Sequence, residues 1–85
     1  MNETELLEKI RRLAAIYRVV FTRHARLRMG ERTVSREDVR KVLCEAARAD
    51  PLDGHKRRIS GQDLDGDDLT VIAVVDDDVI VVTVF

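Results

Sequence analysis

The feature that most constrains this fold is a change in hydrophobic period near residue 55. Before it, apolar residues recur at helical spacing; after it, they alternate with polar residues or form short apolar runs. The second half therefore predicts three antiparallel strands, over residues 55–62, 69–75 and 79–85. The last two are apolar at nearly every position, and such strands usually lie in the centre of a sheet that is covered on both faces.

Turn residues separate the predicted strands. Asp65-Gly66 joins the first strand to the second, and the three aspartates at 76–78 join the second to the third. Short turns between antiparallel strands predict a meander.

The first part of the chain predicts a helix, a short strand and a second helix. Apolar residues recur at helical spacing over residues 4–16, which predicts the N-terminal helix. Residues 17–21 are rich in β-formers and predict a strand. Thr22 is a suitable N-cap for a short helix over residues 23–30, and we expect Gly30 to terminate it.

A further helix is predicted to begin after Ser35. Ser35 is the expected N-cap, Asp38 occupies the position of the acidic partner in a capping box, and Val34 and Val39 form a hydrophobic staple. We expect Asp50-Pro51 to end this helical region. The predicted buried stripe consists of Val39, Val42, Leu43 and Ala46.

The predicted order is an N-terminal helix, a short strand, two helices and a three-stranded antiparallel meander, which is an α+β fold. The 85 residues allow one domain, which we divide into a helical extension over residues 1–16 and a core over 17–85. Two short helices can cover only one face of the sheet. The other face is left to the N-terminal helix, to a partner protein or to a second copy of the chain.

Charge is unevenly distributed along the chain. Residues 1–48 carry twelve Lys and Arg against seven acids, a net +5, and residues 49–85 carry three against nine, a net −6, which together give −1. Most of the cations are arginines, whose planar guanidinium suits phosphate and carboxylate groups. This distribution agrees with a phosphate-binding surface, with an acidic partner, or with solvated helix faces.

We expect a cytoplasmic protein. The single cysteine, Cys44, excludes an internal disulfide, and the first residues lack the features of a secretory signal. No apolar run reaches the roughly 18 to 20 residues needed to span a membrane.

The first candidate site is His24, Arg28 and Arg32. On a helix, His24 and Arg28 lie within about 40° of each other, and Arg32 follows if the helix continues. An imidazole beside guanidinium groups can move a proton near neutral pH and stabilise charge on a phosphate, as phosphodiester cleavage requires. The alternative is structural: His24 caps the turn and Arg28 pairs with an acid.

The second candidate is the basic cluster of Lys56, Arg57 and Arg58. In a regular strand, Lys56 and Arg58 share one face, and Arg57 lies on the other. The cluster can form part of an RNA-binding surface, or it can protect an edge strand from aggregation by its charge.

No metal or cofactor is expected. The aspartate-rich segment 63–68 lacks the glycine and glutamate positions of an EF-hand, so we interpret it as a hairpin turn. Cys44 has no Cys or His at zinc-binding spacing, and no nucleotide-binding fingerprint is present.

Two short motifs carry a resemblance to a known family. They are the run Thr22-x-His24-Ala25-x-x-Arg28-Met29-x-x-Arg32-x-x-Ser35 and the closing strand Val82-Thr83-Val84-Phe85. Both resemble a small bacterial family of unknown function over residues 17–85. The fold of that family is similar to RelE, ParE and MqsR toxins, and its members are often encoded beside an antitoxin-like protein with a zinc finger.

The resemblance implies a toxin that acts as a metal-independent endoribonuclease and binds an antitoxin-like partner. It implies a catalytic site at His24, Arg28, Arg32 and Thr83, and substrate contacts from Lys56, Arg57 and Arg58. This chain is nearly neutral, whereas such toxins are usually basic, which weakens the expected affinity for RNA. The competing hypothesis is a non-catalytic module that binds an antitoxin-like protein or a second copy through its apolar sheet.

Overall fold

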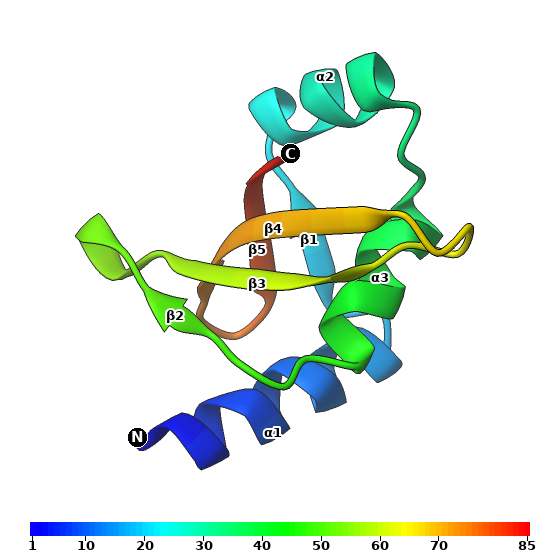
Figure 1. Ribbon diagram of the computed structural model, residues 1–85. Helices are drawn as coiled ribbons and strands as arrows, with labels where there is room; N and C mark the ends of the chain where they lie inside the picture. Colours follow the sequence, from blue (N-terminus) through cyan, green and yellow to red (C-terminus); the bar gives the residue numbers. More distant parts are fainter.

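The computed structural model describes all of residues 1–85 and contains three helices and one five-stranded mixed sheet (Figure 1). The helices are α1 (Glu3–Ala15), α2 (Arg23–Arg32) and α3 (Arg36–Cys44), and a 3-10 turn, η1, spans Asp53–His55. The strands are β1 (Val19–Phe21), β2 (Asp50–Pro51), β3 (Arg57–Gln62), β4 (Asp68–Val75) and β5 (Val79–Val84).

The strand order in the sheet is β1-β5-β4-β3-β2. β1 runs parallel to β5, and every other neighbouring pair is antiparallel. The α+β prediction and the C-terminal meander are confirmed. β4 and β5, the two strands that are apolar on both sides, lie in the interior of the sheet as predicted.

Local side-chain hydrogen bonds begin the helices where the sequence predicts. The Ser35 hydroxyl accepts the Asp38 N–H at 3.0 Å and the Asp38 carboxylate accepts the Ser35 N–H at 2.8 Å, which completes the capping box. The Thr22 hydroxyl accepts the Ala25 N–H at 3.1 Å and donates to the Val82 carbonyl at 3.0 Å. Thr22 therefore begins α2 and also attaches it to β5.

Two predicted boundaries are wrong. Gly30 does not end α2; the helix continues to Arg32 and ends at Thr33, whose φ of 56° is left-handed. The Val34 N–H then donates to the Met29 carbonyl at 2.8 Å, so the chain turns where Val34 reaches the core.

The segment at Asp50-Pro51 does not end a helix either. α3 already ends at Cys44, and Asp50–Pro51 forms the edge strand β2, paired with Arg57 and Arg58. Proline is tolerated there because an edge strand has one side without ladder partners.

A single core lies between the helices and one face of the sheet. α1 contributes Leu7, Ile10, Leu13 and Ala14 to an 18-residue cluster that also contains the buried residues of α3. The sheet contributes seven residues on this side: Ile59, Leu69, Val71, Ala73, Val79, Val81 and Val84. α1 thus packs with α3 on the same side of the sheet, and the alternative that it covers the second face is wrong. The reason is that the apolar stripes of α1 and α3 bury each other.

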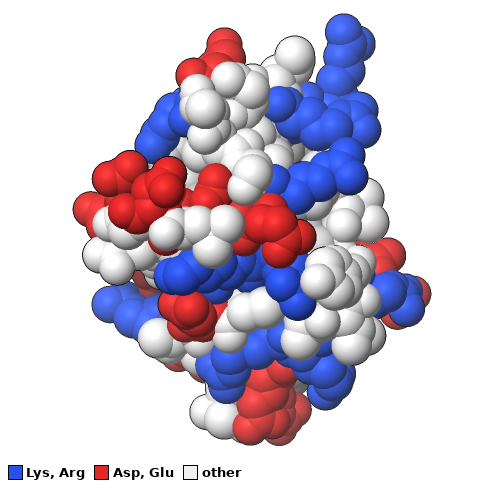
Figure 2. All heavy atoms as spheres, turned by 90° about the vertical axis from the view of Figure 1, so that its right-hand side faces the viewer, with Lys and Arg blue, Asp and Glu red and all other residues white.

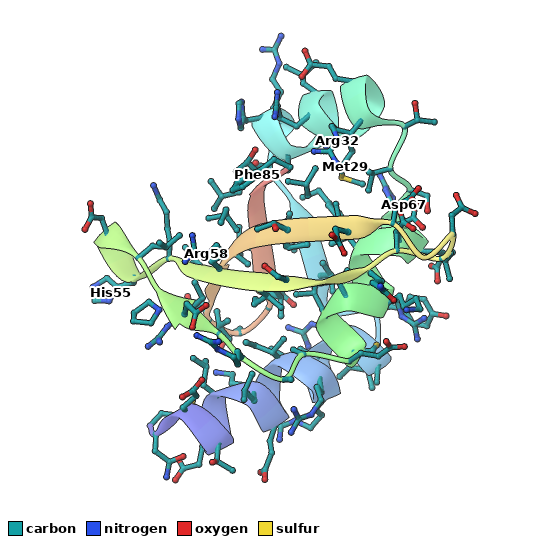
Figure 3. The ribbon with its side chains drawn as sticks, viewed as in Figure 1. Met29, Arg32, His55, Arg58, Asp67 and Phe85 are labelled. Carbon is teal, nitrogen blue, oxygen red and sulfur yellow. The ribbon has the colours of Figure 1, made fainter.

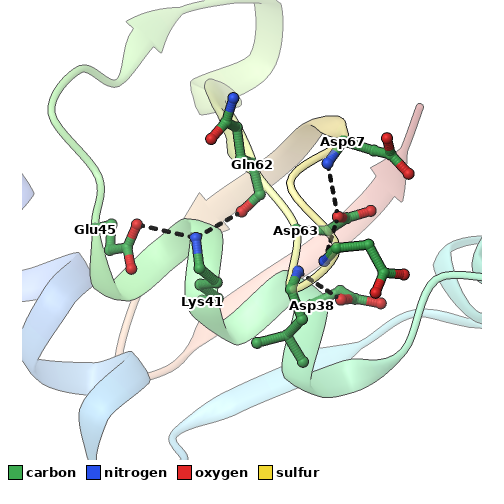
Figure 4. A network of polar contacts seen from close by, with 8 residues as sticks. Asp38, Lys41, Glu45, Gln62, Asp63 and Asp67 are labelled. Atoms are coloured by element: carbon green, nitrogen blue, oxygen red, sulfur yellow. Dashed lines mark hydrogen bonds and ion pairs between the residues drawn. The ribbon is translucent and has the colours of Figure 1, made fainter.

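The aspartate-rich segment is a hairpin turn, attached to α3 (Figure 4). Asp63 accepts the N–H groups of Asp65 and Asp67, both at 2.9 Å, and Asp38 accepts the Leu64 N–H at 3.0 Å. The Lys41 ammonium donates to the Gln62 carbonyl at 3.2 Å. Hydrogen bonds from the backbone of Ser35 and then of Leu64 hold the pKa of Asp38 below its usual value, because they stabilise the carboxylate.

The folded chain brings its basic and acidic halves together. On the face shown in Figure 2, patches of basic and acidic side chains lie beside one another rather than on separate sides. Ion pairs such as Arg18–Asp78 join the two halves directly. None of the helices is both long and apolar enough to cross a bilayer.

Candidate functional site

The second face of the sheet carries no helix and is the candidate site. We call it the open face. Cross-strand partners share a face of a sheet, so the register identifies its residues. The open face consists of Val20, Asp50, Arg58, Ser60, Gln62, Asp68, Thr70, Ile72, Val74, Ile80, Thr83 and Phe85.

These residues form four rows across the strands, the last of which is the pair Gln62 and Asp68 next to the hairpin turn. An apolar row contains Val20, Ile80 and Val74. The middle row contains Asp50, Arg58, Ile72 and Thr83. The third row contains Ser60, Thr70 and Phe85, in which the Ser60 and Thr70 hydroxyls are 3.2 Å apart. The open face is therefore apolar near β1 and polar near β3.

Two shallow hollows, each of about 540 to 550 Å³, lie over the polar part of the open face. One is lined by Ser60, Thr70 and residues 47, 48 and 50, and the other by Ile72, Lys56 and residues 51–53. Arg58 and Phe85 line both. Arg58 thus stands between the two hollows.

The Arg58 side chain is exposed and makes no hydrogen bond or ion pair within the chain, whereas the side chains of Arg57 and Arg48 are engaged. Arg57 lies on the covered side, opposite Ala73, and donates to the Ala49 carbonyl at 3.2 Å. Arg48 pairs with Asp50 at 2.9 Å. The guanidinium of Arg58 is therefore available for an anion.

The predicted residues of α2 lie along one exposed side of the helix. His24 is in the first turn, Arg28 pairs with Glu31 at 3.4 Å, and Arg32 is the last helical residue. The hydrogen bond from the Thr22 hydroxyl to the Val82 carbonyl attaches the start of α2, the turn that carries His24, to β5. Arg32 lies at the opposite end of α2, away from Arg58 (Figure 3).

The structure brings together only some of the predicted site. Thr83 and Arg58 share one row of the open face, and Lys56 lines the same hollow as Arg58. His24 lies in the first turn of α2, which the Thr22–Val82 hydrogen bond attaches to β5. Arg57, Arg28 and Arg32 do not join them. The second histidine, His55, is exposed on η1, at the left of Figure 3 and apart from α2.

Sequence reasoning did not find the other members of the open face. Phe85 is 48% exposed and lines both hollows, and Ser60 and Thr70 form a hydroxyl pair. The signal was the alternation of polar residues along β3 and β4, at positions 58, 60 and 70. That signal becomes informative only when the pairing of the two strands is known.

Chemically, the open face offers cationic, hydroxyl and aromatic groups and two carboxylates, those of Asp68 and of Asp50, which pairs with Arg48. Arg58 and Lys56 suit phosphate oxygens, Thr83 can donate a hydrogen bond, and the Phe85 ring can stack on a base. No group of three His, Cys, Asp or Glu side chains is arranged to hold a metal ion.

Comparison with known families identifies most of the chain. Residues 21–85, from the end of β1 to the C-terminal Phe85, match the family described as Domain of unknown function (DUF4258). The chain belongs to this family. The match excludes α1, although α1 is part of the core, and no curated protein or solved structure matches the chain. The description of this family names no activity, so membership does not assign one to the chain.

Proposed function

We propose that the open face binds the phosphodiester backbone of single-stranded RNA, and that His24, in the turn of α2 attached to β5, cleaves it without a metal ion. The observation that carries this proposal is Arg58, an exposed and unpaired guanidinium between two hollows. An arginine on an uncovered sheet face, with a threonine hydroxyl in its row, suits a phosphate group.

The proposed reaction is an internal transfer. The ribose 2′-hydroxyl attacks the adjacent phosphorus, the bond to the 5′-oxygen breaks, and the products are a 2′,3′-cyclic phosphate and a 5′-hydroxyl. Neutral His24 takes the proton from the 2′-hydroxyl, and water or the protonated imidazole supplies the proton of the leaving oxygen. Arg58 stabilises the additional negative charge on the phosphate, and Thr83 orients it.

The placement of the cations favours modest affinity. Only two cations without an ion pair line the hollows over the open face, Arg58 on the face itself and Lys56 beside it. Each phosphate contact adds to affinity and to its salt dependence. We therefore expect weak binding that depends strongly on salt, in agreement with the near-neutral charge of the chain.

The test uses a fluorescently labelled single-stranded RNA, with binding followed by anisotropy at several salt concentrations and cleavage followed on gels. Arg58→Ala should weaken binding about tenfold and lower the salt slope by about 0.7, the contribution of one phosphate contact. The matched control is Arg12→Ala, which removes an exposed arginine from α1, on the covered side, and should change neither quantity. Equal binding by both variants contradicts the proposal.

The cleavage step is tested by comparing the two histidines. His24→Ala should abolish cleavage and leave RNA binding intact, whereas His55→Ala should cleave normally. Induced expression in a bacterial host should show the same pattern in growth and in the integrity of total mRNA. Loss of cleavage in His55→Ala alone would remove His24 from the mechanism.

The second candidate function is a binding module without catalysis. It is favoured by the apolar row of Val20, Ile80 and Val74, in which Val20 is 48% exposed and no helix covers the row. In this function an antitoxin-like protein or a second copy covers the sheet. It predicts a complex or dimer in sedimentation and no cleavage of RNA at any protein concentration.

A further inference from the structure

β1 has an unpaired backbone edge. It is the terminal strand of the sheet, and its alternate residues pair with β5: the Arg18 carbonyl accepts the Val79 N–H, and the Thr22 N–H donates to the Val81 carbonyl, both at 3.0 Å. In a parallel pair the intervening residues direct their backbone groups to the other side. Val19 and Phe21 therefore present N–H and C=O groups that a further strand can use.

A groove runs along this edge, between β1 and α3. It has a volume of about 290 Å³ and is lined by Tyr17, Val19, Phe21, Arg36, Glu37 and Arg40. The guanidinium of Arg36 lies 5.7 Å from the centre of the Phe21 ring and makes no ion pair. Arg40 is engaged by Glu37 and by the carbonyls that end α1. The groove thus carries one free positive charge, from Arg36, above an aromatic floor.

Tyr17 occupies a backbone position that favours glycine. Its φ is 62°, its N–H donates to the Ala14 carbonyl, and the next N–H, of Arg18, donates to the Leu13 carbonyl at 2.8 Å. This is the Schellman arrangement that ends α1, in which the left-handed residue is usually glycine. The Tyr17 side chain is 68% exposed, so burial does not account for its presence. Its ring extends the groove, beneath the guanidinium of Arg40 at 4.0 Å.

We propose that the β1 edge is the docking site for an extended segment of a partner protein in which acidic and apolar residues alternate. The side chains of a strand added to β1 alternate between the two faces of the sheet, which differ in character. Those on the open face lie beside Val20 and continue its apolar row, and those on the other side face Arg36. A second copy fits less well, because it brings its own Arg36 and Arg40 to the same groove. The proposal is independent of RNA cleavage.

The test uses a blocked heptapeptide of alternating valine and glutamate, and the same peptide with lysine in place of glutamate. We expect the glutamate peptide to bind at least about tenfold more tightly, as one charge pair gained or lost implies. On binding, the backbone amides of Val19 and Phe21 should become protected from hydrogen exchange. Arg36→Glu should reverse the preference between the peptides, and Arg12→Glu, the matched charge change on α1, should not.

A second variant separates docking from folding. Tyr17→Gly relieves the left-handed backbone, so it should fold at least as stably as wild type and still bind the glutamate peptide more weakly. Equal binding of the two peptides, no binding at millimolar concentration, or unchanged exchange at Val19 and Phe21 overturns the proposal. A dimer in which these two amides are already protected also overturns it, because a second copy then occupies the edge.

Discussion

The two faces of the sheet are built from the same strands, but one face packs in the core and the other carries no helix. On the covered face, residues such as Ile59 and Val71 are fully buried in the core between the sheet and the helices. On the open face, their neighbours Ser60 and Thr70 are polar, and Phe85 is half exposed. Ile72 is only 6% exposed although no helix covers it, because it lies in a hollow with Arg58 and Phe85. Apolar residues on both sides of a strand therefore do not require two layers of helices, since long side chains on the sheet can shield them.

The largest expected difference in stability between the two faces comes from substituting adjacent residues of β3. Ile59→Ala should lower the free energy of unfolding by about 2 to 5 kcal/mol, because it leaves a cavity in the core. Ser60→Ala, on the open face, should change it by less than about 0.5 kcal/mol. Urea denaturation measures both. Similar losses would mean that the open face is covered in solution.

The next test addresses the connection between α2 and the open face. Thr22→Val removes the hydroxyl that caps α2 and donates to the Val82 carbonyl. We expect a loss of about 1 to 3 kcal/mol in denaturation experiments, from the cap and one hydrogen bond. Thr22→Ser keeps the hydroxyl and is the control. If Thr22→Val is as stable as Thr22→Ser, α2 is held by its apolar contacts alone.

A smaller and pH-dependent effect is expected from Asp38, on the covered side. Its pKa is lowered in the folded protein from the usual 3.8, so the carboxylate stabilises the fold above pH 3.8, and this stability is lost as the pH falls through the folded pKa. Asp38→Asn should cost about 1 to 2 kcal/mol at neutral pH, because it weakens the capping box and the contact with Leu64. The difference between wild type and variant should shrink in acid. A difference that is constant from pH 7 to pH 2 would contradict this assignment.

The smallest effects on stability should come from the adjacent arginines of β3. Arg57→Ala removes a hydrogen bond to Ala49 and should cost about 0.5 to 1.5 kcal/mol, whereas Arg58→Ala should stay within about 0.5 kcal/mol of wild type. For RNA binding we expect the reverse: Arg58→Ala should weaken affinity more than Arg57→Ala. Thermal denaturation and RNA titration of the two variants measure both effects. If Arg58→Ala lost as much stability as Arg57→Ala, Arg58 would have a structural role.

Predictions from local sequence succeeded where neighbouring residues decide the outcome. The caps at Thr22 and Ser35, and the turn at Asp65-Gly66, depend on hydrogen bonds within a few residues. The prediction that Gly30 ends α2 was wrong because a glycine is tolerated within a helix. The packing of Val34 against the core decided where α2 ends. The candidate site was predicted in part, because strand alternation separates Arg57 from Arg58 but does not say which of the two faces a helix.

The sequence by itself determined the type of each major element, because helical and alternating periods are local properties of the chain. Tertiary structure decided the parallel pairing of β1 with β5 and the position of α1 beside α3. It also decided that Arg58 stays unpaired while Arg57 is engaged. These outcomes depend on which apolar surfaces find each other across long stretches of chain, and hydrophobic burial has no preferred direction that a local pattern could encode.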